Sequence, residues 1–323
     1  MGETRLTSIY IFEILQKYSD EEHKLNREQI QRHLRDDYAI EVSERTIGYI
    51  IKALKNDGRA LGNRNTYCRG IFSDNELRVL VDGIFFGKHV TTQKADELIG
   101  KLKGLGSNRL KKHIRHIHYI KDMSRTDNDN LYSVLDGLDE AIDQGKQVRI
   151  TQCAYDLKKR LVKTHDAIVS PYYIVSSRGM YYLICYAGRD DQLETRRIDR
   201  ILEVEVLKEK SVDIRKIPEY SQKSFDLPEY MKEHLYMFSG RCSSIEVCIQ
   251  KKHIGDIIDW CGKGFRVVSE SEEYAVIRVY VNENAFYYWC LQYGAYVEVL
   301  RPEHMRKRMR EGMQNMLEKY KCK

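Results

Sequence analysis

Residues 43–58 read SERTIGYIIKALKNDG, and this stretch decides the fold of the N-terminal part of the chain. Ser43 is a typical helix N-cap and Gly58 a typical helix terminator, so the spacing predicts one helix between them. Apolar residues at i, i+3, i+4 and i+7 form its buried face: Ile47, Ile50, Ile51 and Leu54. Hydroxyls, a tyrosine and cations form the opposite face: Ser43, Arg45, Thr46, Tyr49, Lys52 and Lys55. Such a face suits the DNA major groove, where short polar groups and cations meet base edges and phosphates.

Two further helices are predicted before this one. Apolar residues at helical spacing indicate a helix over residues 5–18, and Asn26 with Gln29 forms a capping-box signal for a second helix. After Gly58, residues 59–69 mix glycine, asparagine and arginine, including Arg64, as expected of a basic hairpin. The order resembles the winged helix-turn-helix of DeoR-like bacterial regulators, with residues 43–55 as the recognition helix. A three-helix bundle used for protein contacts is the alternative.

Composition limits the class of protein. The chain has 323 residues, 42% of them hydrophobic, and only 4 prolines, which favours two or three folded domains over disorder. No apolar run approaches the roughly 18–20 residues of a membrane span. The 8 cysteines are scattered, without a CxxC or a His/Cys group at zinc spacing. We therefore expect reduced thiols, a cytoplasmic protein, no metal and no cofactor.

Positive charge is clustered more than the net charge of +6 suggests. Residues 43–69 hold 6 basic and 2 acidic side chains, and residues 88–125 hold 10 and 3. Residues 126–145 hold six acids and no lysine or arginine. Clustered cations suit a polyanionic partner, although ordinary solvated faces explain them equally well.

Residues 73–145 are predicted to be a helical connector, with helices starting after Ser73 and running over 92–102 and 131–144. The segment 111–118 contains His113, His116 and His118, which invites a metal interpretation. Their spacing does not define one chelating face, so a basic surface strand or loop is favoured.

The periodicity changes at residue 146, where short alternating segments separated by turn signals begin. Five such strands predict a small barrel. Their ranges are 148–155, 167–173, 180–186, 194–198 and 201–207.

This part resembles the WYL family of bacterial transcription regulators. The naming motif is matched by residues 181–183 (YYL), the preceding strand by 170–173 (SPYY) and the arginine-rich strand by 197–201 (RIDRI). Tyr181 stands where the family usually has tryptophan, and Glu194 stands near a position where many members have a further arginine.

The WYL resemblance implies an Sm-like barrel over residues 146–212 with an effector-binding site on its strands. Aromatic rings that stack on bases and guanidinium groups that bind phosphates suit a nucleotide or single-stranded nucleic acid. His165 and Arg160 lie nearby in sequence and are candidates to extend the site. The core of the mapped site comprises Tyr155, Ser170, Tyr182, Arg197 and Arg200.

Residues 213–323 are predicted to form a βαββαβ module of the ferredoxin-like type. The stretch 289–302 (WCLQYGAYVEVLRP) is similar to the C-terminal extension that often accompanies WYL domains, which implies a role in dimerisation. Trp289 and Tyr293 share one helical face, where core packing is favoured over a binding cleft.

The whole chain is thus expected to be an α+β multidomain protein, with a winged helix-turn-helix (1–72), the connector, the barrel and the C-terminal module. The expected function is a homodimeric, ligand-responsive transcription regulator that binds double-stranded DNA. An accessory protein that binds RNA or single-stranded DNA through the barrel is the alternative. An enzyme is not expected, because the sequence contains no nucleophile elbow, P-loop or metal motif.

Overall fold

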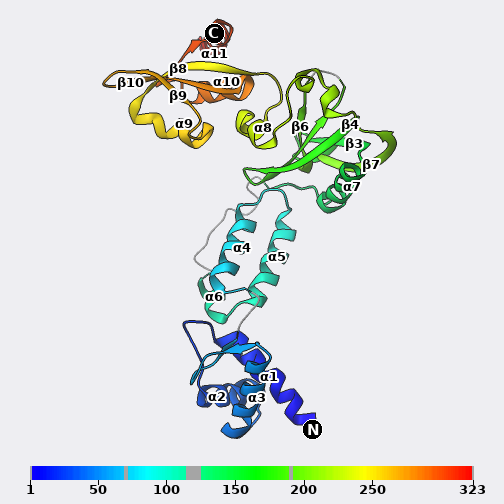
Figure 1. The fold of residues 1–323 in the computed structure, drawn as a ribbon, viewed down its shortest axis with the longest axis vertical. Coiled ribbons are helices and arrows are strands. Elements are labelled where there is room, and N and C mark those ends of the chain that lie inside the picture. The colour runs from blue at the N-terminus through cyan, green and yellow to red at the C-terminus, as the bar shows by residue number, and fades with distance from the viewer. Residues whose placement is uncertain (1, 69–71, 114–124, 189–191, 322–323) are drawn as a thin grey trace. The chain divides into compact units, whose positions relative to one another are not determined.

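The computed structural model describes residues 2–68, 72–113, 125–188 and 192–321 (Figure 1). The chain divides into two compact units, Met1–Asp127 and Asn128–Lys323. Helices and several sheets occur together, so the fold is mixed α and β. Among the described residues, no helix has both the length and the apolar character needed to cross a membrane.

The first unit begins with three helices, α1 (Gly2–Tyr18), α2 (Arg27–Tyr38) and α3 (Glu44–Asn56). Both predicted caps are present: Asn26 and Gln29 form a reciprocal capping box, and the Ser43 side chain accepts a hydrogen bond from the Thr46 amide. The apolar faces of the helices meet in one core, which includes Ile11, Ile14, Leu15, Ile30, Leu34, Ile47, Ile50 and Ile51.

A small hairpin follows α3, formed by β1 (Ala60–Leu61) and β2 (Tyr67–Cys68). Leu25, which precedes α2, forms an isolated β-bridge with Thr66 through two backbone hydrogen bonds. Gly62 turns the hairpin at φ +100°, and a Cβ there would lie 2.2 Å from the Asn65 carbonyl oxygen. The bridge therefore ties the hairpin to the segment that precedes α2.

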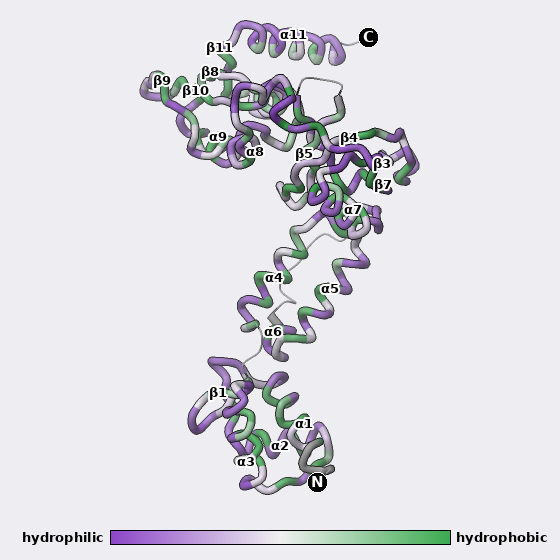
Figure 2. The backbone as a smooth tube through the Cα atoms, turned by 45° about the vertical axis from the view of Figure 1, so that its right-hand side comes forward, coloured by the Kyte–Doolittle hydropathy of each residue, from purple (hydrophilic) through white to green (hydrophobic). Residues whose placement is uncertain are grey.

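Three more helices follow in the described residues of the first unit: α4 (Asp74–Phe86), α5 (Thr92–Leu105) and α6 (Asn108–His113). Figure 2 shows hydrophilic and hydrophobic residues alternating along α4 and α5, as expected of helices that bury one side. Their shared core contains Leu77, Val81, Ile99 and Leu110. The predicted surface strand or loop at 111–118 is wrong for residues 111–113, which continue α6, and His116 and His118 lie outside the described residues.

The second unit begins with α7 (Leu131–Gln144), which packs on the sheet that follows it. The strands are β3 (Lys146–Tyr155), β4 (Leu161–Ser177), β5 (Met180–Tyr186), β6 (Glu194–Arg197) and β7 (Ile201–Lys210). The three-residue turn η2 (Ile198–Arg200) connects β6 to β7. The helix over 131–144, assigned from sequence to the connector, therefore covers the sheet of the second unit.

The strand order of this sheet is β6-β5-β4-β3-β7, and all its pairings are antiparallel. In the described residues β6 and β7 form the two edges and do not pair with each other, so the predicted closed barrel is not confirmed. The physical reason is the shortness of β6, which ends after four residues where η2 diverts the chain.

A polar segment connects the sheet to the C-terminal module through η3 (Ile214–Lys216), η4 (Pro218–Tyr220), α8 (Leu227–Glu233) and η5 (Leu235–Met237). Tyr220, Tyr230 and Met237 from this segment are buried in one cluster with Val175 and Ile184 of the sheet. The segment is therefore part of a core and not a free linker.

The C-terminal module has the predicted βαββαβ order. It comprises β8 (Cys242–Gln250), η6 (Lys251–His253), α9 (Ile254–Cys261), β9 (Arg266–Glu270), β10 (Tyr274–Asn282), α10 (Glu283–Gln292), β11 (Val297–Arg301) and α11 (Glu303–Tyr320). The strand order β11-β8-β10-β9 is the ferredoxin-like order. Its core joins Ile245 and Ile277 of the sheet to Ile257 of α9 and Phe286 of α10.

Candidate nucleic-acid interface and effector site

The face of α3 that the sequence assigns to DNA is exposed to solvent. Arg45, Tyr49 and Lys52 are all exposed, and Tyr49 keeps 65% of its surface accessible. Arg45 and Lys52 have no hydrogen bond or ion pair to any described residue. Ser43 and Thr46 are instead bonded to each other, with 3.0 Å between their hydroxyl oxygens at the N-terminus of the helix. The helix therefore presents two unpaired cations beside an exposed aromatic ring.

Lys55 has a different position from the one expected. Its Nζ donates to the carbonyl oxygens of Gly62 at 2.6 Å and Asn63 at 3.1 Å. These bonds fasten the last turn of α3 to the hairpin. Arg64, near the tip of the same hairpin, is exposed. Lys55 thus holds the hairpin in place, whereas Arg64 remains available to a partner.

Arg27 was not singled out from the sequence, yet it lies beside the exposed face of α3. A Cβ built on Gly48 would lie 3.1 Å from the Arg27 guanidinium carbon, so the guanidinium group rests directly on the α3 backbone. Gly48 is three residues after Arg45 and four before Lys52, so these positions share one helical stripe. The only sequence signal was a glycine inside a strongly periodic helix, which indicates close approach of a neighbouring group.

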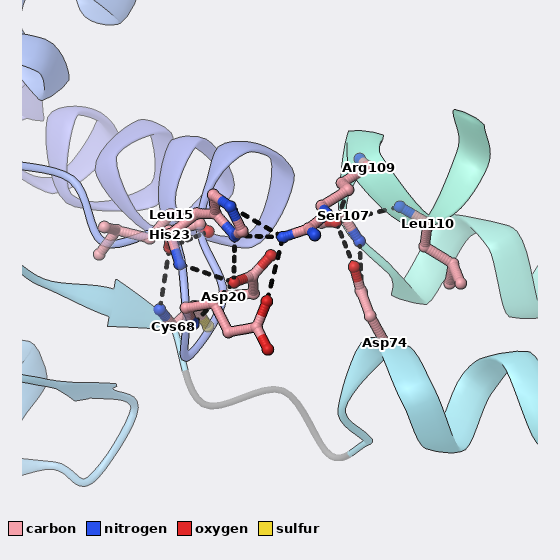
Figure 3. A network of polar contacts seen from close by, with 10 residues as sticks. Leu15, Asp20, His23, Cys68, Asp74, Ser107, Arg109 and Leu110 are labelled. Carbon is pink, nitrogen blue, oxygen red and sulfur yellow. Dashed lines mark hydrogen bonds and ion pairs between the residues drawn. The ribbon is translucent and has the colours of Figure 1, made fainter. Parts of the chain in front are cut away.

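A polar network attaches the loop before α2 to α6 within the first unit (Figure 3). His23 Nδ1 lies 2.9 Å from the Asp20 carboxylate, and Arg109 Nη1 lies 2.8 Å from His23 Nε2. Next to Arg109, the Ser107 amide donates to Asp74 at 3.1 Å. Partial burial opposes ionisation of Asp20, but the hydrogen bonds from His23 and Glu22 outweigh it and lower its pKa. The loop therefore has a defined position relative to the helices that follow it.

In the second unit, Asp199 gathers two of the predicted effector residues. Its buried carboxylate accepts two hydrogen bonds from Arg197, Nε at 2.9 Å and Nη2 at 2.7 Å. Arg200 Nε lies 3.7 Å from the same carboxylate. Asn128 donates to the Asp199 and Ile201 carbonyl oxygens, which holds the η2 turn. One buried negative charge thus orients two guanidinium groups.

Tyr155 completes this group from the neighbouring strand. The Arg200 guanidinium carbon lies 4.3 Å from the centre of the Tyr155 ring. Nη1 of Arg200 is buried and has no hydrogen-bond partner among the described residues. The arrangement places a cation against an aromatic ring, a combination that suits an anionic, ring-containing ligand.

Tyr182 lies directly opposite Arg197 in the β5–β6 ladder. Its ring packs partly against the core cluster of Tyr220 and Tyr230, and burial raises its pKa although Arg197 acts in the other direction. The hydroxyl is therefore kept neutral. Of the five predicted effector residues, Tyr155, Tyr182, Arg197 and Arg200 are brought together.

The other candidates lie apart from this group. Ser170 is buried and accepts a hydrogen bond from the Val212 amide at 3.0 Å, so it fixes the chain after β7. Arg160 is paired with Asp156 in the β3–β4 turn. His165 is exposed on β4, opposite Gln152. Ser170 and Arg160 therefore have structural partners of their own.

Arg178 is a further residue that the sequence did not single out. Ser177 and Met180 pair across a two-residue turn in which Arg178 and Gly179 have φ of 51° and 75°, the type I′ geometry. The Arg178 guanidinium carbon lies 3.6 Å from the centre of the Trp260 ring in α9. This turn therefore connects the five-stranded sheet to the C-terminal module.

Trp289 and Tyr293, at the C-terminal end of α10, pack in the core of the C-terminal module. Trp289 is fully buried in the module core, and Tyr293 packs against it. The Tyr293 hydroxyl accepts a hydrogen bond from Trp260 Nε1 at 3.2 Å. These aromatic residues hold α9 and α10 together.

The second unit is thus a five-stranded antiparallel sheet with an arginine-bearing turn, followed by a ferredoxin-like module. Residues 133–206 match the WYL domain, and residues 244–317 match the WCX domain. The chain therefore contains a WYL domain followed by a WCX domain. The WYL match begins inside α7, in agreement with the packing of that helix on the sheet.

Two solved structures align with almost the whole length of the chain. Proteasome accessory factor B/C (PafBC) of Arthrobacter aurescens is 14% identical, with a TM-score of 0.30, over 98% of this chain and 49% of that one. A CRISPR Cas-related protein is 15% identical, with a TM-score of 0.38, over 99% and 87%. This chain thus spans about half the length of PafBC. A search of curated proteins finds no match.

Proposed function

We propose that the protein is a transcription regulator whose N-terminal winged helix-turn-helix binds double-stranded DNA and whose WYL domain senses an effector. The observation that carries the DNA-binding half is the exposed face of α3. Arg45 and Lys52 have no partner in the described chain, and Arg27 lies beside them. Unpaired cations on the exposed face of a helix, next to a basic hairpin, suit phosphates and base edges.

The sensing half rests on the group around Asp199. Two guanidinium groups share one carboxylate, which leaves one net positive charge beside the Tyr155 ring. A nucleotide or a segment of single-stranded nucleic acid offers the matching phosphate and base. Binding there is proposed to change the affinity for DNA.

A homodimer is part of the proposal. The outer half of α11 exposes apolar side chains at i, i+3, i+4 and i+7, which are Met313, Met316, Leu317 and Tyr320. A contiguous apolar stripe on an exposed helix is typical of a helix that packs on a partner, and a dimer would present two recognition helices to two half-sites. The proposed role involves no catalytic step.

Genomic duplex fragments recovered by a pull-down with the full-length protein provide the test, with binding measured by fluorescence anisotropy. Replacing Arg45 and Tyr49 together by alanine should weaken specific binding at least tenfold, because a well-placed base contact contributes about 1–3 kcal/mol. Lys101→Ala is the matched control, since Lys101 is an exposed cation of the same unit that is paired with Glu97. Unchanged affinity in the double variant would exclude α3 as the recognition helix.

The same assay with single-stranded oligonucleotides distinguishes the alternative function. The contact between Arg200 and Tyr155 favours single strands in the WYL domain. If single strands bind tightly while no genomic duplex binds specifically, the protein is an accessory single-strand-binding protein and not a regulator.

A further inference from the structure

Three arginines and one glutamate form a row across the four-stranded sheet of the C-terminal module. Arg278 of β10 is paired in register with Arg266 of β9 on one side and with Glu246 of β8 on the other. Glu246 is paired in turn with Arg301 of β11. Directly opposite residues of an antiparallel pair have their side chains on the same face of the sheet. Each strand therefore contributes one charged side chain to a single row, which we call the arginine row.

The arginine row lies on the face of the sheet that points away from the module core. On β10, the exposed Arg278 stands between Ile277 and Val279, which are buried in the core together with α9 and α10. The same alternation surrounds Glu246 on β8. Because successive side chains of a strand point to opposite faces, the row is directed toward solvent.

A surplus of positive charge remains in the arginine row. Glu246 accepts a hydrogen bond from Arg278 Nε at 2.9 Å and lies 3.8 Å from Arg301 Nε. Arg266 is exposed and makes no hydrogen bond or ion pair with any residue that the structure describes. Like charges directly opposite each other in a sheet are destabilising, yet Arg266 stands opposite Arg278. One carboxylate thus offsets three guanidinium groups, and two positive charges are left over.

A cavity of about 460 Å³ opens beside the row. Its volume falls within the roughly 300–1,000 Å³ that is typical of small-molecule sites. Charged, polar and apolar side chains line it together, among them Arg278, Arg301, Glu246, Ser244, Glu303 and Leu300. Two guanidinium groups of the row therefore meet a hydroxyl, a second carboxylate and an apolar side chain around one concave space.

We propose that this cavity binds a small phosphate monoester, such as a nucleoside monophosphate, at a site separate from the group around Asp199. A phosphate monoester carries about −1.5 to −2 charges near neutral pH, which matches the surplus of the row. Guanidinium groups bind phosphate oxygens through paired hydrogen bonds. Ser244 supplies a further donor, and Glu303 accepts from a hydroxyl of the ligand. The volume exceeds that of a phosphate ion, so it leaves space for the organic part beside Leu300.

The test is isothermal titration calorimetry of the full-length protein with AMP in a phosphate-free buffer of low ionic strength. Adenosine, which lacks the phosphate, should not bind at this site, and added salt should weaken AMP binding. Arg301→Gln should weaken AMP binding roughly tenfold, because it removes hydrogen bonds to a charged group. The ion pair of Arg301 is long and exposed, so its loss should leave the Tm unchanged.

Two further variants separate ligand binding from stability. Glu246→Gln should strengthen AMP binding several-fold, because it removes the carboxylate that competes with phosphate for Arg278 and Arg301. Arg266→Gln should weaken AMP binding while the Tm of the protein rises, because it removes a like-charge pair from the sheet. Residues that served only the stability of the sheet would not give these opposite effects.

Arg310→Gln is the matched control, because Arg310 is an exposed arginine of α11 outside the row and the cavity lining. It should bind AMP like the wild type. The proposal is overturned if the wild-type protein binds AMP no better than adenosine, or if Arg301→Gln and Arg310→Gln bind AMP equally. Arg200→Gln is titrated in parallel. A loss of AMP binding confined to Arg200→Gln would place the nucleotide in the WYL domain and also overturn the proposal.

Discussion

The guanidinium carbon of Arg200 lies 4.3 Å from the centre of the Tyr155 ring, although the two residues are 45 positions apart in the chain. Tyr155 ends β3 and Arg200 ends η2. Because β3 pairs with β7 directly after this turn, the ladder itself brings the ring and the cation together. The same turn carries Asp199, so the position of Arg200 depends on one buried carboxylate.

Tyr155→Leu is expected to weaken binding of a fluorescein-labelled single-stranded oligonucleotide roughly tenfold, since stacking on an aromatic ring contributes about 1–3 kcal/mol per base. Fluorescence anisotropy of the full-length protein measures the change. Tyr274→Leu is the matched control, because Tyr274 is 41% exposed, close to the 37% of Tyr155, and lies on β10. An equal loss in both variants would contradict a specific site at Tyr155.

Asp199→Ala is expected to destabilise the second unit by about 3 kcal/mol, because it leaves two guanidinium groups without their shared carboxylate. Urea denaturation, followed by a probe in the second unit, measures the free energy of unfolding. Asp166→Ala, which removes an exposed carboxylate on β4, should change it little. Similar curves for the two variants would show that Asp199 does not organise the turn.

Gly48→Ala is expected to separate stability from DNA binding. Alanine in a helix interior is favoured by about 1 kcal/mol over glycine, so the Tm of the first unit should rise. The new Cβ would displace the Arg27 guanidinium, so affinity for duplex DNA should fall. Gly83→Ala in α4 is the control, since its Cβ would meet no atom within 4 Å. It should raise the Tm without any effect on DNA, and unchanged DNA binding in Gly48→Ala would remove Arg27 from the interface.

His33 should make the first unit less stable in acid. Its ring stacks on Tyr18 at 3.9 Å, and burial lowers its pKa below the ordinary value of 6.5. The unfolded chain therefore takes up a proton at a higher pH than the folded chain. The contribution of the neutral His33 ring to the stability of the folded unit is complete above pH 6.5. This contribution is lost as the pH falls from 6.5 through the pKa of His33 in the folded chain.

Calorimetric scans at about pH 7.5 and about pH 5.5 measure this effect. His33→Phe keeps a ring beside Tyr18 but cannot titrate, so the Tm of its first unit should fall less on acidification. Replacement of His304, an exposed histidine on α11, is the control. If the wild type and His33→Phe respond equally to pH, the His33 ring does not contribute the dependence.

Elements with strong periodicity were predictable in detail. The caps at Asn26, Ser43 and Ser73 and the helix over 131–144 were all read from the chain, because capping bonds and helical periodicity are local. The roles of Lys55 and Ser170 were not, since each depends on a backbone group that only the fold places beside it. The same is true of Arg178, whose partner Trp260 belongs to another module.

The sequence by itself determined the order of the helices and strands, the exposed cationic face of α3 and the motifs of the WYL domain, because each is a pattern within a short segment. Tertiary structure alone decided which cations remain unpaired and which carboxylate holds Arg197 and Arg200. The physical reason is that charge pairing depends on distances of a few ångströms between groups whose separation is set by the fold. Such distances are set by packing of the whole unit and leave no periodic trace in the residues themselves.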